Sequence, residues 1–460
     1  MSPDDSLMHR AVPSRSHSLR ALALWMAALG CWGCASYPQR TAAALEDFQR
    51  GHLSAAQTEY EDRDTTGSEF LRGAEAGTVA LARGDWDGAL TNLGAAAEVS
   101  REAEDAALIS AERSGEWLLS WILNESVLKY EGEGYERVLL HAGMALAYLG
   151  KNNLSDAEVE LRRANALLER EEELYKKEYA AGGLGHFLSA VTYELDGKPD
   201  EAYIDYKRMQ AKGLGGELVG RALVRLAARL DYSEDLREWK QKFGFEPEKN
   251  VKQASIVVVA AVGLGPYKRE TSLSIPTPNG LFKWAIPTYV DRLQTIQGVS
   301  LGLVGGDTQI ATVVIEDSAR VARENLDDRI AWLAAKSAVR GLMKHELTRQ
   351  LSRNLGGHDW DSGGAALGWI IGAVATAATE RADLRCWQTL PHTWQAAHAF
   401  VDPGTSELFV QAGSQRVDLG RYQLAAGETM FLFVRTLDGH VFAHAIGGQK
   451  LENQVAEPKP

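Results

Sequence analysis

One spacing pattern limits the fold of the first half of the chain more than any other feature. A Gly is followed five residues later by an Ala and four residues after that by a large apolar residue. The copies are Gly51, Ala56 and Tyr60; Gly84, Ala89 and Leu93; and Gly197, Ala202 and Tyr206, with a looser copy at Gly150, Ala157 and Leu161. A Gly permits a tight turn between two helices, a small Ala lets the helices approach, and the large residue fills the groove between neighbouring pairs.

The distance between copies indicates the kind of repeat. Ala56 and Ala89 are 33 residues apart, and Ala89 and Ala157 are 68 apart, which is twice 34. Ala157 and Ala202 are 45 apart, so an insertion lies between them. A period of about 34 residues in a helical stretch is typical of tetratricopeptide repeats (TPR). We therefore predict a TPR-like helical solenoid over residues 31–245.

Two clusters inside this array have more than one interpretation. Trp117, Trp121 and Leu128 could share a helical stripe, either in the core or in a protein-binding groove. Glu136 and His141 follow the YEGEGY loop on a predicted helix, where they could form an acid–base pair. The alternative, which we favour, is that these polar residues fix the start of the helix by hydrogen bonds.

The first residues have the features of a bacterial lipoprotein signal. Arg10, Arg15 and Arg20 precede an apolar run at 21–30, which is too short to span a bilayer. We predict a signal peptide over 1–30 and acylation at Cys31, with Cys34 as the alternative site. Neither cysteine is followed by an Asp, the usual signal for retention in the inner membrane. The expected location is the outer membrane, with the protein facing the periplasm.

The composition changes to that of a β-rich region after a polar junction at 244–250. Short apolar or alternating segments predict strands at 255–261, 271–275, 281–286, 299–304, 309–315, 395–401, 407–411, 430–434 and 441–446. We predict a β-sandwich or partly open barrel over 253–450, with a helical insertion at about 318–380 and a polar tail at 451–460. The overall fold class is α+β with several domains.

The predicted insertion contains a segment without charge, residues 363–379. Gly364, Gly368 and Gly372 are spaced by four residues, which places them on one face of a helix. Such a face permits close packing of helices. Packing on the chain's own sheet is the expectation, with self-association and membrane contact as alternatives.

Composition and motifs exclude several functions. Lys and Arg number 49 and Asp and Glu 62, a net charge of -13, so the chain is not a general binder of nucleic acid. The sequence has no GxGxxG, P-loop or HExxH motif, and we predict no cofactor and no metal. His358, Asp359 and Asp361 are read as turn residues. Cys386, with His392 and His398, is read as a strand end, so we do not predict an enzyme.

Four segments resemble an uncharacterised family of TPR-containing envelope lipoproteins of Gram-negative bacteria. They are residues 130–150, 187–209, 257–289 and 382–405, and Ala142-Gly143 departs from the pattern, which has bulkier residues there. The resemblance implies no catalytic residues. Members of this family tend to be encoded near other envelope lipoproteins, including ones that resemble activators of penicillin-binding proteins, so the resemblance implies a part in cell-wall or envelope assembly by association alone.

These observations predict a membrane-anchored scaffold or assembly factor of the cell envelope. Its TPR groove would bind a protein partner, such as another lipoprotein or a cell-wall synthesis factor, and the acidic charge favours a basic partner segment. The alternatives are a cell-wall enzyme using Glu136 and His141, and a component that forms homo-oligomers through the glycine-rich helix.

Overall fold

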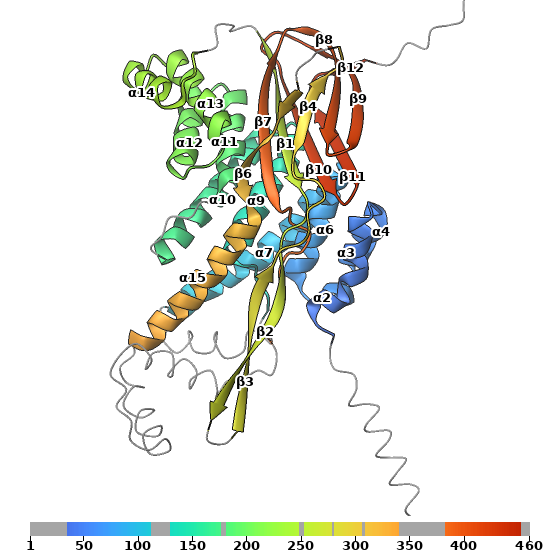
Figure 1. Cartoon of the computed structure of the whole chain (residues 1–460), viewed down its shortest axis with the longest axis vertical. Helices are drawn as coiled ribbons and strands as arrows, with labels where there is room; N and C mark the ends of the chain where they lie inside the picture. Colours follow the sequence, from blue (N-terminus) through green and yellow to red (C-terminus); the bar gives the residue numbers. More distant parts are fainter. Residues whose placement is uncertain are drawn as a thin grey trace, which may run out of the picture.

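The chain has an α+β fold in which helices come first and sheets follow (Figure 1). The computed structural model describes residues 35–111, 129–175, 181–247, 253–277, 280–305, 309–339 and 382–451. The described helices of the first part span α2 (Tyr37–Arg40), α3 (Ala42–Gln49), α4 (Leu53–Glu61), α5 (Arg63–Thr66), α6 (Glu69–Arg83), α7 (Trp86–Ala111), α9 (Gly134–Gly150), α10 (Leu154–Tyr175), α11 (Gly183–Leu195), α12 (Pro199–Ala211), α13 (Gly216–Arg229) and α14 (Ser233–Phe243).

The longer helices pack as consecutive pairs. Helix α6 packs on α7, α9 on α10, α11 on α12 and α13 on α14, and each pair also contacts the next through α7 and α9, α10 and α11, and α12 and α13. Glycine permits the turn between paired helices: Gly84 caps α6 with a φ of 72°, in the left-handed region. After α9, Asn152 takes the left-handed conformation instead, with a φ of 56°. The copy that begins at Gly150 therefore has its turn two residues later.

Two five-stranded sheets and a two-stranded ribbon form the second part. The strands are β1 (Ala254–Val262), β2 (Tyr267–Thr277), β3 (Gly280–Val290), β4 (Val299–Leu303), β5 (Gln309–Ala311), β6 (Val313–Asp317), β7 (Thr393–Val401), β8 (Gly404–Ala412), β9 (Gln415–Leu424), β10 (Thr429–Leu437), β11 (His440–Ile446) and β12 (Gln449–Leu451). The first sheet has the order β11-β10-β1-β7-β6 and the second β12-β9-β8-β4-β5. Strand β1 is parallel to β10 and antiparallel to β7.

Strand β1 is buried on both faces, which explains its continuous apolar sequence. Ile256, Val258 and Ala260 belong to an apolar core shared by the two five-stranded sheets. The alternating residues Val257 and Val259 belong to the larger core shared with the helices. The first sheet is thus the middle layer between the second sheet and the helices.

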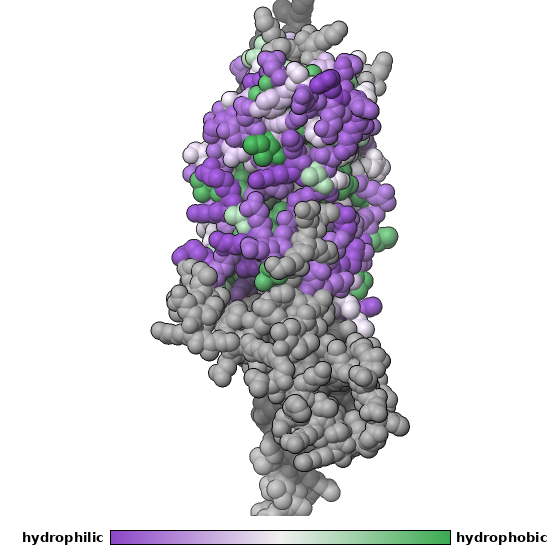
Figure 2. All heavy atoms as spheres, turned by 90° about the vertical axis from the view of Figure 1, so that its left-hand side faces the viewer, coloured by the Kyte–Doolittle hydropathy of each residue, from purple (hydrophilic) through white to green (hydrophobic). Residues whose placement is uncertain are grey.

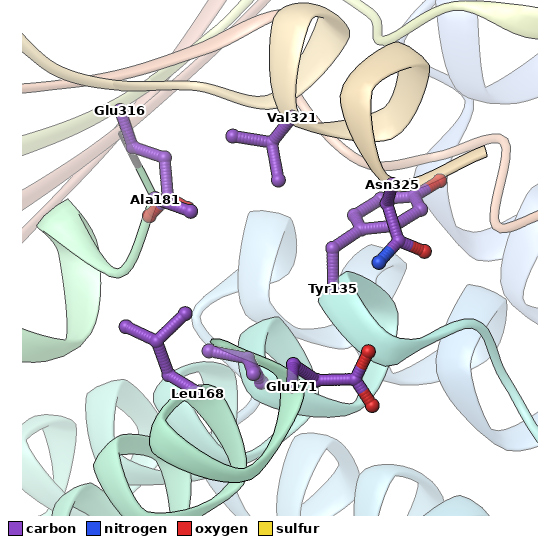
Figure 3. A pocket seen from close by; sticks show the side chains of 8 residues that line it. Tyr135, Leu168, Glu171, Ala181, Glu316, Val321 and Asn325 are labelled. Atoms are coloured by element: carbon purple, nitrogen blue, oxygen red, sulfur yellow. The ribbon is translucent and has the colours of Figure 1, made fainter. Parts of the chain in front are cut away.

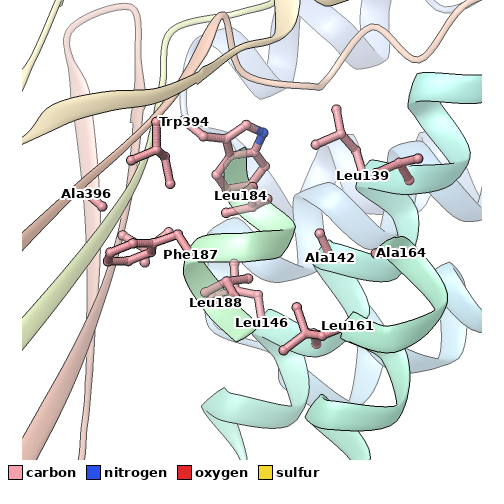
Figure 4. Packing of buried hydrophobic residues seen from close by; sticks show 14 of the residues in the cluster. Leu139, Ala142, Leu146, Leu161, Ala164, Leu184, Phe187, Leu188, Trp394 and Ala396 are labelled. Carbon is pink, nitrogen blue, oxygen red and sulfur yellow. The ribbon is translucent and has the colours of Figure 1, made fainter. Parts of the chain in front are cut away.

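The same sheet covers the face of the array formed by the first helix of each pair. In Figure 4, Leu184 and Phe187 of α11 lie beside Trp394 and Ala396 of β7. Helices α11 and α13 contact β6, and α13 also contacts β7. A Cβ at Gly183 would lie 1.8 Å from the carbonyl oxygen of Ile315, so α11 approaches the backbone of β6 closely. The chain's own strands therefore occupy this inner face.

The two-stranded ribbon of β2 and β3 projects away from the two sheets (Figure 1). Among the described strands, β2 and β3 pair only with each other. Helix α15 (Ser318–Val339) runs toward the same end of the molecule and contacts β3. The ribbon thus extends from the body instead of joining either sheet.

Each predicted strand overlaps a strand of the structure, whereas β9 and β12 were not predicted. The predicted insertion begins with α15, but the glycine-rich segment at 363–379 lies outside the described residues. The signal peptide at 1–30 and the tail at 452–460 also lie outside them.

Candidate functional site

Two buried glutamates from the helical part bind the backbone of one segment of the β-rich part, residues 386–390 (CWQTL). Glu75 of α6 accepts hydrogen bonds from the backbone N–H groups of Gln388 at 2.7 Å and Thr389 at 2.9 Å. Glu136 of α9 accepts one from the N–H of Trp387 at 2.7 Å. Through these bonds, residues 386–390 are fixed against the inner face of the array.

Glu75 is fully buried and lies within a run of mainly small and apolar residues of α6, residues 73–82. A buried carboxylate is costly unless donors satisfy its oxygens. Besides the two backbone N–H groups, Tyr37 Oη donates to Glu75 Oε1 at 2.5 Å. Burial raises the pKa of Glu75, although these hydrogen bonds oppose the rise. Glu75 therefore joins α2, α6 and residues 386–390 at one point.

Glu136 lies in the first turn of α9, where it forms a capping box with Glu133. It accepts hydrogen bonds from Tyr130 Oη at 2.7 Å and the Glu133 N–H at 3.0 Å, and a longer one from Tyr135 Oη at 3.4 Å. Burial, with the nearby charge of Glu133, raises the pKa of Glu136 to about 7. With the Trp387 N–H, four donors surround this carboxylate.

A buried ion pair lies beside this carboxylate. Lys268 of β2 pairs with Glu133, and the two side chains are 4% and 1% exposed. Burial opposes the charge on Lys268, but the attraction of Glu133 outweighs burial, and the pKa of Lys268 is raised. Tyr289 of β3 completes the junction, since its hydroxyl lies 3.1 Å from that of Tyr135. These contacts attach the base of the ribbon to the start of α9.

The structure places Glu136 and His141 in different surroundings. Glu136 is turned toward residues 386–390, whereas His141 Nδ1 lies 2.6 Å from Glu160 Oε2 of α10. Both side chains are engaged with different neighbours, and no hydrogen bond joins them among the described residues. These contacts are those expected of residues that fix the start of α9 by hydrogen bonds, and they are not those of an acid–base pair.

A thiol site would need Cys386 together with His392 or His398, of which Cys386 is buried and the two histidines are partly exposed. Cys386 is 1% exposed, and burial raises the pKa of its thiol to about 12. Burial lowers the pKa of His398 to about 4, and its ring stacks on Phe400 at 4.5 Å between centroids. A neutral buried thiol is a poor nucleophile.

A small cavity lies between α9, α10 and α15 (Figure 3). Its lining residues are Tyr135, Val138, Leu168, Glu171, Ala181, Glu316, Val321 and Asn325. Its volume of about 20 Å³ suits a single water molecule better than a substrate. Glu316 accepts hydrogen bonds from the N–H groups of Gly182 at 3.1 Å and Leu184 at 2.9 Å, which fixes the start of α11 on β6.

The residues of the repeat pattern are almost fully buried. Their side chains are 0% or 1% exposed at Ala56, Tyr60, Ala89, Leu93, Ala157, Leu161, Ala202 and Tyr206. Gly51, Gly84 and Gly197 all have positive φ angles at turns between helices. Cys31, Cys34, Trp117, Trp121, Gly364, Gly368 and Gly372 lie outside the described residues, as do His358, Asp359 and Asp361.

Sequence reasoning did not single out Glu75, Glu133 or Lys268. The available signal was an acidic residue in the small apolar run AEAGTVALA of α6. The described residues contain no group of three or more His, Cys, Asp or Glu side chains arranged to hold a metal ion.

No protein-family model matches the chain, and neither the curated proteins nor the solved structures contain a significant match. In the part of the chain that the structure describes, no helix is both long and apolar enough to span a bilayer.

Proposed function

We propose that this protein is a lipid-anchored scaffold or assembly factor of the Gram-negative outer membrane that faces the periplasm and binds protein partners. One observation carries the proposal: a buried residue of the described fold, Tyr37, lies only a few residues after the candidate acylation sites. Tyr37 is three residues after Cys34 and six after Cys31, and it is 3% exposed. Its hydroxyl donates to Glu75, so the start of the fold is tied to the central junction.

The short separation has a physical consequence for an acylated chain. An extended chain spans about 3.3–3.6 Å per residue, so Tyr37 lies within about 10 Å of an acylated Cys34 or about 20 Å of an acylated Cys31. The body would therefore stay at the membrane surface and would not extend on a long linker. This arrangement suits a protein that holds partners at the membrane.

We further propose that the helices form a TPR-like solenoid and that the two five-stranded sheets form a β-sandwich. The consecutive packing of helix pairs and the buried alanines at near-regular spacing support the first. The apolar core between the two sheets supports the second.

The occupied inner face changes where a partner is expected to bind. Because strands β6 and β7 and residues 386–390 cover the first helices of the pairs, we place the partner on the outer surface formed by α7, α10, α12 and α14. Figure 2 shows the side of the molecule on which α10, α12 and α14 lie, and its coloured surface is mainly hydrophilic with small separate hydrophobic spots. A partner would therefore bind here through polar and charged contacts, with steering by charge.

We propose no catalytic role for Glu136. Its four hydrogen-bond donors and its full burial support a structural role at the junction. The enzyme alternative predicts that purified protein cleaves peptidoglycan and that Glu136→Gln abolishes cleavage in a variant that remains folded.

Photo-crosslinking in the native envelope tests the scaffold proposal. A photoreactive amino acid at Ile204, which is 52% exposed on α12, should crosslink to one defined envelope protein. The same amino acid at Gln423, an exposed position of β9, is the matched control. Equal crosslinking of many proteins from both positions, or no crosslink from any outer helix, would contradict the proposal.

A further inference from the structure

The β2–β3 ribbon has no partner strand on either edge among the described residues, although each strand has 11 residues. An isolated two-stranded ribbon is marginally stable in water, and its free edges invite contact with another surface. Figure 1 shows the ribbon reaching beyond the helices and sheets. Among the described strands, both edges of the ribbon are therefore open to contact with a further surface.

The base of the ribbon is fixed to the body, so its direction is defined. Lys268 pairs with Glu133, and the hydroxyl of Tyr289 contacts that of Tyr135. Glu270 accepts a hydrogen bond from the N–H of Ala382 at 3.1 Å. Three contacts on two strands resist rotation of the ribbon about its base.

The strand register divides the ribbon into two unlike faces. Leu273 is opposite Trp284, and Ile275 is opposite Phe282. Because positions alternate between faces along a strand, these pairs share one face with the pair Thr271 and Ile286. The other face contains the pairs Ser272 with Ala285, Ser274 with Lys283 and Pro276 with Leu281, none of which includes an aromatic residue. Apolar and aromatic positions thus follow one face through the outer half of the ribbon.

The start of the fold indicates what this face meets. Helix α2, which begins at Tyr37, lies toward the end of the molecule to which the ribbon projects, and the ribbon extends beyond it (Figure 1). A bilayer that holds an acyl chain at Cys31 or Cys34 must lie within the short reach of α2. It would lie on the side to which the ribbon points.

We infer that the β2–β3 ribbon is a second membrane contact, with the face of Phe282 and Trp284 seated at the boundary between headgroups and acyl chains. This inference rests on the proposed lipid anchor. Trp and Phe suit the membrane interface, and a lysine at position 283 suits anionic headgroups. Two contacts, the acyl chain and the ribbon, would fix the orientation of the body on the bilayer.

A fluorescent probe on the ribbon tests this inference. The acylated protein is placed in vesicles of phosphatidylethanolamine and phosphatidylglycerol, and an environment-sensitive dye is attached at Phe282→Cys or, as the matched control, at Lys283→Cys. If Cys31 is the acylated residue, both labelled chains also carry Cys34→Ala, since a free Cys34 would take the dye; if Cys34 is acylated, Cys31 leaves with the signal peptide. Cys386 is 1% exposed and does not compete for the dye in the folded protein. The dye at 282 should shift to the blue and be quenched by brominated lipids, whereas the dye at 283 should change less.

A second measurement separates the ribbon from the anchor. The chain with Cys31→Ala and Cys34→Ala should still partition onto the same vesicles, and Phe282→Ser with Trp284→Ser should weaken this partitioning about tenfold or more. A dye at 282 that remains in water in the acylated, vesicle-bound protein would overturn the inference and leave the anchor intact. A blue shift that needs no vesicles would assign the face to protein contact instead. If the native chain is not acylated but the dye still enters lipid, the anchor fails and the ribbon contact stands.

Discussion

Replacing Glu75 by Ala should weaken the contact between the helical and β-rich parts more than any single surface change. The substitution removes the acceptor for the N–H groups of Gln388 and Thr389 and for the hydroxyl of Tyr37. Each buried donor left without a partner costs about 1–3 kcal/mol. The summed cost of the three unpaired donors is partly offset, because the substitution also removes the unfavourable burial of the carboxylate. We expect a loss of about 3–5 kcal/mol in the free energy of unfolding.

Urea unfolding followed by circular dichroism and tryptophan fluorescence measures this loss. Glu46→Gln, at a glutamate of α3 with a 57% exposed side chain, is the control and should change stability by less than about 0.5 kcal/mol. Hydrogen exchange locates the effect, because the amides of 388 and 389 should lose protection in Glu75→Ala before the strands do. A loss below about 1 kcal/mol with unchanged protection of these amides would show that Glu75 does not hold residues 386–390 against the helices.

Three further outcomes are expected. Burial raises the pKa of Glu136 to about 7, so its contribution to stability is complete below the unfolded value of 4.5 and is lost as the pH rises through about 7. The wild-type protein should therefore lose stability relative to Glu136→Gln between these two pH values. A difference in urea titrations that stays constant over this range would contradict the prediction. Lys268→Met should cost about 3–5 kcal/mol by leaving Glu133 unpaired, and Glu133→Gln in the same chain should restore part of it, whereas additive losses would exclude the pair. Ala89→Leu should overpack α6 against α7 and lower stability by about 1–3 kcal/mol in thermal melts, and tolerance of Leu there would disprove the close contact.

Local patterns in the sequence are sufficient to predict much of the secondary structure. The unbroken apolar run at 255–261 predicted a buried strand because β1 has apolar cores on both faces. Strand β9 was not predicted because its sequence, QRVDLGRYQL, is polar and contains a glycine at the irregularity in its pairing with β8. Its strand conformation depends on hydrogen bonds to β8, which the sequence does not display.

The central junction could not be derived from sequence patterns. Glu75 contacts residues more than 300 positions away, and Glu136 contacts a residue 251 positions away. An acidic residue in an apolar helix signals a buried carboxylate, but it does not identify the donor. For the same reason, the array appeared to offer an open groove, whereas the chain's own strands fill the described part of that groove.

Mass spectrometry of the N-terminal peptide from native membranes tests whether the protein is held to the bilayer by an acylated cysteine. We expect a mature protein that lacks residues 1–30 and begins with an acylated cysteine at position 31, or one that lacks residues 1–33 and begins at position 34 if the alternative site is used. The short separation from Tyr37 would then hold the folded body at the bilayer. An unmodified N-terminus, with both cysteines retained as free thiols, would contradict the lipid anchor and with it the proposed function.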